Sequence, residues 1–260
     1  MDSNITLRPT YWASVSGGKD SLYMLYYILN HLDKYPLDGV VHFELSIDYP
    51  FVKDVVNEIE AECNRIGLAF FRIRPKDDWM DLYNKWGYPA RNARWCNKWK
   101  LQASSILSKM MKDQGKRVIN YIGFCADETR RFRFDLDSRG EKVTQIYPLA
   151  ENGIREETIW LWAREHPIYN QYYKYNKRCG CMGCPMSPAR QMAYLSVFYP
   201  EEFKQICDLA SATEKEKDTY VWSAIHTDTE GMKEKIKKYL PLKELPVDPF
   251  QYSIMEDLNQ

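Results

Sequence analysis

Two serines, two glycines, a lysine and an aspartate stand together near the start of the chain, in the segment Ser16–Ser21. The preceding Tyr11–Val15 has the apolar composition of a short buried strand, and apolar residues recur at helical spacing after the segment. A helix that follows a strand presents its first N–H groups outward, the glycines let the backbone approach a ligand, and Lys19 adds positive charge. The segment therefore predicts a phosphate-binding loop. For the two glycines alone, the alternative is an ordinary turn with Asp20 or Ser21 as N-cap.

Cysteines form the second group of residues that could do chemistry. Arg178–Pro185 contains Cys179, Cys181 and Cys184, separated by glycines and a methionine. Two cysteines with two residues between them can bring two thiolates to a metal, but a complete site needs a further ligand, for which Cys96 is the candidate. We predict a shared metal centre of Cys96, Cys181 and Cys184, with Cys179 as a lower-ranked fourth ligand. Spacing alone does not choose the metal.

Strand and helix patterns alternate through the first half of the chain. Strands are expected at 11–15, 40–45, 69–73, 118–124 and 144–147. Helical spacing of apolar residues lies between them, from Leu22 to Leu32 and from Val52 to Ile66. The alternation predicts an α/β fold with a parallel sheet, helices on both faces, and ligands at the carboxyl ends of the strands. We expect an α/β domain with the loop at 1–150, and a helical region with the cysteine cluster at 151–260.

Ser16–Ser21 reads SGGKDS and resembles the PP-loop, SGGxDS, of the adenine nucleotide alpha-hydrolase-like superfamily. Four further segments are similar, in order, to motifs of the phosphoadenosine phosphosulfate (PAPS) reductase family. They are GYPARNARWCNKWK at 87–100, GFCADETRR at 123–131, YPL at 147–149 and RCGCMGCP at 178–185. The resemblance runs from about residue 10 to residue 200. It implies the adenine nucleotide alpha-hydrolase-like fold.

Two features separate this chain from the sulfonucleotide reductases of that family. Those reductases carry a degenerate loop because they bind a nucleotide without cleaving its α–β bond, whereas SGGKDS is intact here. They also attack sulfur with a cysteine near the C-terminus, and this sequence has no cysteine after Cys207. The chain is therefore more similar to the ATP-using branch, which includes the iron–sulfur tRNA 2-thiocytidine synthetase and the DNA phosphorothioation protein.

This resemblance implies that ATP is cleaved to AMP and pyrophosphate to activate a substrate, with sulfur transfer at an iron–sulfur cluster. A [4Fe-4S] cluster is expected, with zinc as the alternative. Asp20 is the first candidate to bind Mg²⁺, followed by Asp127 and Glu128, and Lys19 and Arg130 would hold phosphates. The expected catalytic residues are Lys19, Asp20, Asp127 and Arg130. The expected nucleotide-binding residues are Ser16, Gly17, Gly18, Lys19, Asp20, Ser21 and Asp48.

Composition is typical of a soluble cytoplasmic enzyme. Lys plus Arg and Asp plus Glu are equal at 36 each, so the chain lacks the overall basic charge of nonspecific nucleic-acid binders. No stretch approaches the roughly 20 apolar residues that span a bilayer, and the N-terminus lacks a signal-peptide core, so we expect no membrane partner. The seven cysteines are an odd number, which argues against a disulfide framework.

Two other functions stay open on the sequence alone. One is a nucleotide-binding regulator without catalysis, whose cysteines hold a structural metal. The other is a sulfonucleotide reductase that uses an external thiol. For an ATP-using enzyme the acceptor could be tRNA, DNA or a small molecule, and a homodimer is left open.

Several cysteines and aromatic residues also have plain structural interpretations. Cys63 and Cys207 fall on apolar helical faces, where a buried packing role is expected. The aromatic run at 169–175 could stack bases or could pack in the core, and it carries no claim of nucleic-acid binding.

Overall fold

Five parallel strands form the sheet of the computed structural model, which describes residues 7–90, 92–129, 144–167 and 169–241. The strands are β1 (Arg8–Ser14), β2 (Gly39–Phe43), β3 (Ala69–Ile73), β4 (Lys116–Tyr121) and β5 (Thr144–Ile146). Their order is β3-β2-β1-β4-β5, and every neighbouring pair is parallel. The predicted α/β fold with a parallel sheet is confirmed. The strand order changes direction between β1 and β4, which is where sheets of this kind bind ligands.

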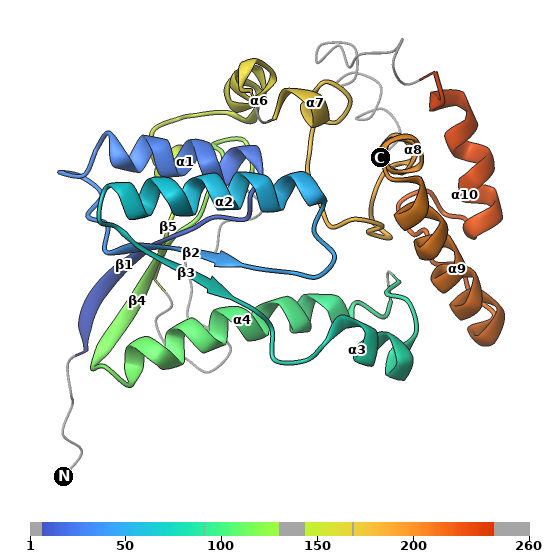
Figure 1. Ribbon diagram of the computed structural model, residues 1–260, viewed down its shortest axis with the longest axis horizontal. Coiled ribbons are helices and arrows are strands. Elements are labelled where there is room, and N and C mark those ends of the chain that lie inside the picture. The colour runs from blue at the N-terminus through green and yellow to red at the C-terminus, as the bar shows by residue number, and fades with distance from the viewer. Residues whose placement is uncertain (1–6, 91, 130–143, 168, 242–260) are drawn as a thin grey trace. The chain divides into compact units, whose positions relative to one another are not determined.

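Helices cover both faces of this sheet, as the sequence predicted. They are α1 (Lys19–Leu29), α2 (Pro50–Arg65) and α4 (Trp95–Lys112), while α5 (Pro148–Glu151) contacts α1 and α6 (Glu156–Glu165) follows α5 in the chain. Figure 1 shows α1 and α2 on one face and α4 on the other. On the α4 side, the sheet residues Trp12 and Val41 form a buried cluster with Leu107 and Met111 of the helix. Each buried side chain of this size contributes about 1.5–3 kcal/mol through removal of apolar surface from water.

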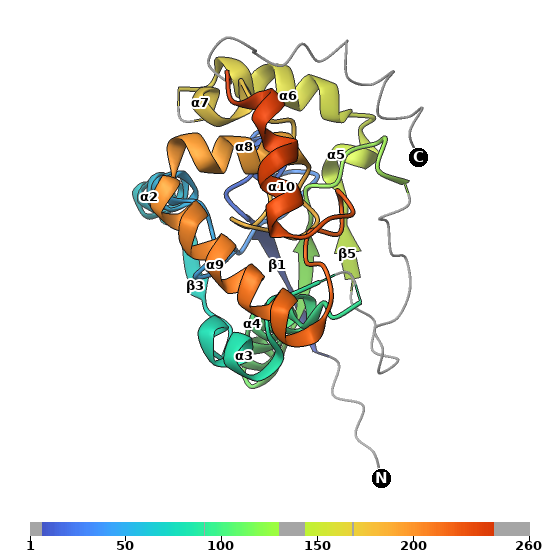
Figure 2. The ribbon, with the colours of Figure 1, turned by 90° about the vertical axis from the view of Figure 1, so that its right-hand side faces the viewer.

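The remaining elements are helical. They are α3 (Trp79–Trp86), α7 (Asn170–Tyr173), α8 (Ala189–Phe198), α9 (Pro200–Lys217), α10 (Thr229–Ile236) and the 3-10 helix η2 (Lys237–Tyr239). Helices α8, α9 and α10 contact one another (Figure 2). Tyr169, Tyr172 and Tyr173 are at most 1% exposed, so these residues of the aromatic run pack in the core. Cys63 and Cys207 are buried, as expected.

The chain divides into two compact units. The first contains the described residues of Met1–Leu45, Pro50–Lys76 and Lys100–Trp162, and the second those of Ser46–Tyr49, Asp77–Trp99 and Ala163–Gln260. The sheet belongs to the first unit. Segments 46–49 and 77–99 group with the C-terminal part of the chain. The division expected at residue 150 instead assigns both segments to the α/β domain, because it divides the chain at a single point. Within the described ranges, none of the helices has both the length and the apolar character needed to span a membrane.

Candidate functional site

The loop between β1 and α1 is stabilised by its own serines. The Ser21 hydroxyl donates to the carbonyl of Gly18 at 2.9 Å, and the Ser16 N–H donates to the Ser21 hydroxyl at 3.1 Å. Gly17 has a φ of +76°, in the left-handed region that favours glycine. A Cβ at this position would lie 2.6 Å from Cγ1 of Val52 on α2. The loop conformation therefore depends on a glycine at this position.

Gly18 is the N-cap of α1, in place of the Asp20 or Ser21 that an ordinary turn would use. It has no side chain with which to cap the first turn, and no side-chain cap bond forms there. The first N–H groups of a helix have no partners within the helix and carry the positive end of the helix dipole. Phosphate groups bind at helix N-termini of this kind.

Lys19 is the first residue of α1, and its side chain is fully buried. Its Nζ atom lies 2.6 Å from Oδ1 of Asp20 and 3.5 Å from Oε1 of Glu156, the first residue of α6. A buried ammonium group is costly unless it is paired. The two carboxylates supply this pairing and hold the lysine beside the loop.

Asp20 lies among other charged groups. Burial raises the pKa of Asp20 above its usual value, the Lys19 ammonium opposes the rise, and the carboxylates of Glu156 and Glu128 add to it. The Asp20 side chain is still 35% exposed. A partly buried carboxylate near other carboxylates is stabilised in its charged form when a cation is close.

The connection after β4 reaches the same loop. A Cβ on Gly123 would lie 2.8 Å from the backbone oxygen of Asp20, so the two backbones pass closely. The Cys125 thiol donates to Oδ1 of Asp20 at 3.7 Å, and the Cys125 N–H donates to Oε2 of Glu128 at 3.2 Å. Burial, followed by the charge of Asp20, raises the pKa of the fully buried Cys125 thiol, so it stays protonated as a donor. The loops after β1 and β4 therefore meet at the switch point.

The remaining residues expected at the nucleotide are placed differently. Asp127 is exposed, and its Oδ1 accepts from the N–H of Glu156 at 3.2 Å, at the start of α6. Arg130 lies outside the described residues. Asp48 is half-buried in the connection between β2 and α2, in a segment that belongs to the second unit.

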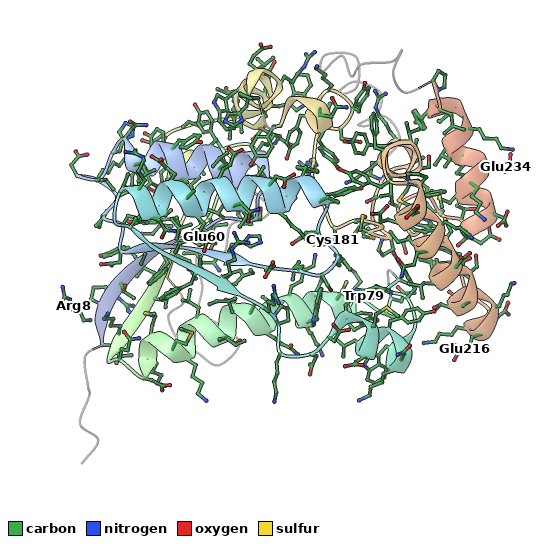
Figure 3. The ribbon with its side chains drawn as sticks, viewed as in Figure 1. Arg8, Glu60, Trp79, Cys181, Glu216 and Glu234 are labelled. Atoms are coloured by element: carbon green, nitrogen blue, oxygen red, sulfur yellow. The ribbon has the colours of Figure 1, made fainter. Side chains whose placement is uncertain are left out.

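The Cys181–Cys184 turn belongs to the second unit, on the connection between α7 and α8, where Figure 3 marks Cys181. The Cys184 N–H donates to the carbonyl of Cys181 at 3.2 Å. Gly183 between them has a φ of +66°, and a Cβ there would lie 2.6 Å from the Tyr88 hydroxyl. That hydroxyl donates to the carbonyl of Gly183 at 2.6 Å. Tyr88 therefore joins the turn to the segment that leads to Cys96.

Four cysteines also act electrostatically on Tyr88. Burial raises its pKa well above the usual value, and Cys184, Cys207, Cys181 and Cys96 add to the rise in that order. The three predicted ligands Cys96, Cys181 and Cys184 thus all affect one tyrosine electrostatically and belong to one unit. Among the described residues, none of the three forms a disulfide bond. Among the residues that the structure describes, however, no three His, Cys, Asp or Glu side chains are placed to hold a metal ion.

Cys179 has different neighbours. Its thiol contributes to the raised pKa values of the buried Tyr49 and Tyr172, after the larger effect of their burial. Cys181 also affects Tyr49 but less strongly than Cys179 does. Cys179 thus acts electrostatically on two buried tyrosines, and its role as a fourth ligand stays a prediction.

Sequence reasoning missed two residues of these sites. Glu156 has the appearance of an ordinary acidic residue in the first turn of a helix, which is common because of the helix dipole. The signal available was its place shortly after the YPL motif at 147–149. Tyr88 was noticed only as part of the motif at 87–100, where its position eight residues before Cys96 was the available signal.

The fold and the loop define the class: an α/β protein with a parallel sheet and a glycine-rich loop at its switch point. No protein-family model matches the chain, and no curated protein gives a significant match.

Solved structures with distant similarity include the following three proteins. Candida glabrata FMN adenylyltransferase is 16% identical with a TM-score of 0.42, over 68% of this chain and 53% of that chain, so the match spans about half of that protein. The U34-tRNA thiolase NcsA from Methanococcus maripaludis, solved with its [4Fe-4S] cluster, is 17% identical with a TM-score of 0.44, over 94% and 75% of the two chains. Yeast FAD synthetase in complex with FAD is 14% identical with a TM-score of 0.36, over 85% and 78%. None of the three is a PAPS reductase, and similarity at this level transfers no function.

Proposed function

We propose that this protein binds ATP on the backbone of Ser16–Ser21 and cleaves it between the α and β phosphates to activate a substrate. The observation that carries the proposal is the loop itself, with a left-handed glycine at Gly17 and a helix N-terminus without a side-chain cap. In the reaction, a nucleophile of the substrate attacks the α phosphorus and the α–β bridging bond breaks. Pyrophosphate leaves with the electron pair of that bond, and the substrate becomes an adenylate.

The charged residues near the loop have roles in this reaction. The departing pyrophosphate develops negative charge, which Lys19 at the loop would stabilise. Mg²⁺ usually binds to one or two carboxylates together with phosphate oxygens and water, so Asp20 and the nucleotide suffice without a third protein carboxylate. Asp127 and Glu128 are further candidates near the cation. Phosphate contacts by Arg130 and adenosine contacts by Asp48 stay predictions from the family resemblance.

The cysteines would couple this activation to sulfur transfer. We propose that Cys96, Cys181 and Cys184 hold an iron–sulfur cluster, with Cys179 as the candidate fourth ligand. In support, the three cysteines belong to one unit, and each adds electrostatically to the raised pKa of the buried Tyr88 after the larger effect of its burial. A cluster binds each thiolate at a different iron, whereas zinc needs its sulfurs around a single ion at about 2.3 Å. When bound, a cluster with three cysteine ligands supplies an iron with an open position for sulfur.

The acceptor could be tRNA, DNA or a small molecule. A second candidate function is favoured by a separate observation. Lys19 is fully buried and is paired with Asp20 and Glu156, so its charge is already matched without a nucleotide. A regulator that binds the nucleotide without cleaving it would tolerate this arrangement. Binding of ATP with no consumption would indicate the regulator, and formation of AMP would indicate the enzyme.

Calorimetric titration of ATP tests the nucleotide site. With Mg²⁺, we expect wild type to bind ATP and Asp20→Ala to bind it at least about tenfold more weakly, because a charge contact of this kind contributes about 1.4 kcal/mol or more. Asp33→Ala is the matched control, since Asp33 is exposed and lies in the same unit. Equal affinity in wild type and Asp20→Ala, without any Mg²⁺ dependence, would contradict the proposal.

Anaerobic purification with metal analysis tests the cysteine site. We expect brown protein that contains iron and sulfide, and loss of both in Cys184→Ala with ATP affinity retained. Cys63→Ala is the control, because Cys63 is a buried free cysteine of the other unit. Colourless protein with bound zinc would indicate a structural zinc ion instead of a cluster. Loss of ATP binding together with the metal in Cys184→Ala would indicate that the metal site has a purely structural role.

A further inference from the structure

We propose that Glu156 is a positioning residue for Lys19 and that it makes ATP binding depend on a divalent cation. This inference rests on the proposed function of the loop. The two residues are 137 positions apart in the chain, yet Oε1 of Glu156 lies 3.5 Å from Nζ of Lys19. The Glu156 side chain is 24% exposed and the Lys19 side chain is fully buried. The contact is therefore largely shielded from solvent.

The backbone fixes where the Glu156 carboxylate begins. The Glu156 N–H donates to Oδ1 of Asp127 at 3.2 Å. Two residues earlier, the carbonyl of Ile154 accepts from the N–H of Ala126 at 2.8 Å. The start of α6 is thus bound to the connection after β4 at two points. Glu156 is held beside the loop by this connection, so its charge stays near Lys19 when a ligand arrives.

The charges around Lys19 decide what can bind to it. In the structure, its ammonium lies between the carboxylates of Asp20 and Glu156. Glu128 also affects Asp20 electrostatically. A polyphosphate that approaches Lys19 without a counter-ion meets these negative groups as well as the ammonium. A divalent cation between Asp20 and the phosphates would offset this repulsion, because Mg²⁺ binds carboxylate and phosphate oxygens together.

The consequence differs for ATP with and without the cation. Without Mg²⁺, Glu156 competes with the phosphates for Lys19 and repels them. With Mg²⁺, much of the phosphate charge is neutralised, and Glu156 then mainly keeps Lys19 oriented at the loop. Glu156→Gln keeps the size of the side chain and an oxygen for Lys19 but removes the negative charge. This substitution should therefore strengthen binding of metal-free ATP more than binding of Mg²⁺–ATP.

The test is calorimetric titration of ATP in Mg²⁺ and in EDTA, with the ratio of the two Kd values as the readout. We expect Glu156→Gln to lower the ratio of Kd in EDTA to Kd in Mg²⁺ about tenfold, as one charge acting across several ångströms of protein would do. Glu157→Gln is the matched control, because Glu157 is the next residue of α6 and is exposed. Glu156→Asp keeps the charge and should restore most of the wild-type ratio.

Each other outcome has a distinct meaning. An unchanged ratio in Glu156→Gln, with ATP still bound by wild type, overturns the inference alone. Equal weakening of both Kd values together with a lower Tm assigns Glu156 to fold stability, which also overturns it. Failure of wild type to bind ATP in either condition overturns the proposed function and this inference with it.

Discussion

Substitution of Gly17 by alanine tests whether the loop needs a residue without a side chain. Gly17 has a φ of +76°, and its added Cβ would meet Cγ1 of Val52 at 2.6 Å and the Val52 carbonyl oxygen at 3.4 Å. The left-handed conformation costs a residue other than glycine about 1–2 kcal/mol. Overpacking against a buried side chain adds about 1–3 kcal/mol. We expect Gly17→Ala to lower the free energy of unfolding by about 2–5 kcal/mol, or to move the loop and lose ATP binding.

Two further variants separate the backbone effect from the contact with Val52. Gly115 has a φ of +70° in the same unit, and nothing lies within 4 Å of a Cβ built there. Gly115→Ala should therefore cost only the backbone part, about 1–2 kcal/mol. The double variant Gly17→Ala, Val52→Ala removes the methyl group that the new Cβ meets. It should be more stable than the sum of its two single variants predicts, because the substituted sites touch.

Thermal and urea unfolding followed by circular dichroism measures these differences in the free energy of unfolding. Titration of the same proteins with ATP measures whether the loop still binds the nucleotide. Equal destabilisation by Gly17→Ala and Gly115→Ala, with ATP affinity unchanged in both, would refute the reasoning. That result would mean that Val52 or the loop shifts at little cost, so the observed conformation of Gly17 would not be needed for binding.

Three other substitutions have clear expected outcomes. Tyr88→Phe leaves the buried carbonyl of Gly183 without its donor and should cost about 1–3 kcal/mol in urea unfolding; an unchanged midpoint would contradict the importance of that bond. Burial lowers the pKa of His42 in the folded protein below its usual value of 6.5. Above the pKa of the unfolded chain His42 is neutral in both states and its contribution to stability is complete. As the pH falls through and below that value, the unfolded chain takes up the proton more readily and the contribution is lost. The melting temperature of His42→Gln should fall less than that of wild type between about pH 7 and pH 5, and parallel curves would exclude this effect. Cys125→Ala removes the donor to Asp20 and should weaken Mg²⁺–ATP binding roughly fivefold, whereas Cys125→Ser should stay near wild type; equal affinities for all three proteins would leave the thiol without a role at the loop.

The sheet could be predicted because its signals are local. Apolar runs such as Ala69–Ile73 are short, and amphipathic helices separate them, so a parallel sheet follows directly. The loop at Ser16–Ser21 is also local, since the strand, the glycines and the helix are adjacent in the chain. In such sheets ligands bind at the carboxyl ends of the strands, where the strand order changes direction. This rule predicts that the loop lies next to the connection after β4.

The contacts around the loop could not be predicted in the same way. The pairing of Lys19 with Glu156 joins residues 137 positions apart, and the sequence near Glu156 contains no sign of a buried lysine. The contact between Tyr88 and Gly183 depends on how segment 77–99 groups with the C-terminal part of the chain. The domain boundary predicted at residue 150 assigns that segment to the unit with the sheet instead. Both contacts are tertiary, so a pattern within one segment does not reveal them.

The site predictions rest on residue types that limit the chemistry. Thiols at Cys96, Cys181 and Cys184 were expected together because a metal needs several ligands; their shared metal centre stays a prediction, and among the described residues no three such side chains are placed to hold a metal ion. Their detailed placement depends on side-chain orientations that spacing does not determine. For Asp127, an acidic residue after a strand indicated a cation ligand, while its observed hydrogen bond is to the start of α6.

Identification of the products of ATP turnover tests the central claim most directly. Purified anaerobic protein, incubated with Mg²⁺–ATP and followed by phosphorus NMR, would show which phosphate bond is broken. Attack on the α phosphorus by water or by an added acceptor predicts one pyrophosphate for each AMP or adenylate formed, at a rate that falls at least about tenfold in Asp20→Ala and stays unchanged in Asp33→Ala. Formation of ADP and inorganic phosphate, which places the cleavage at the γ phosphorus, would contradict the account.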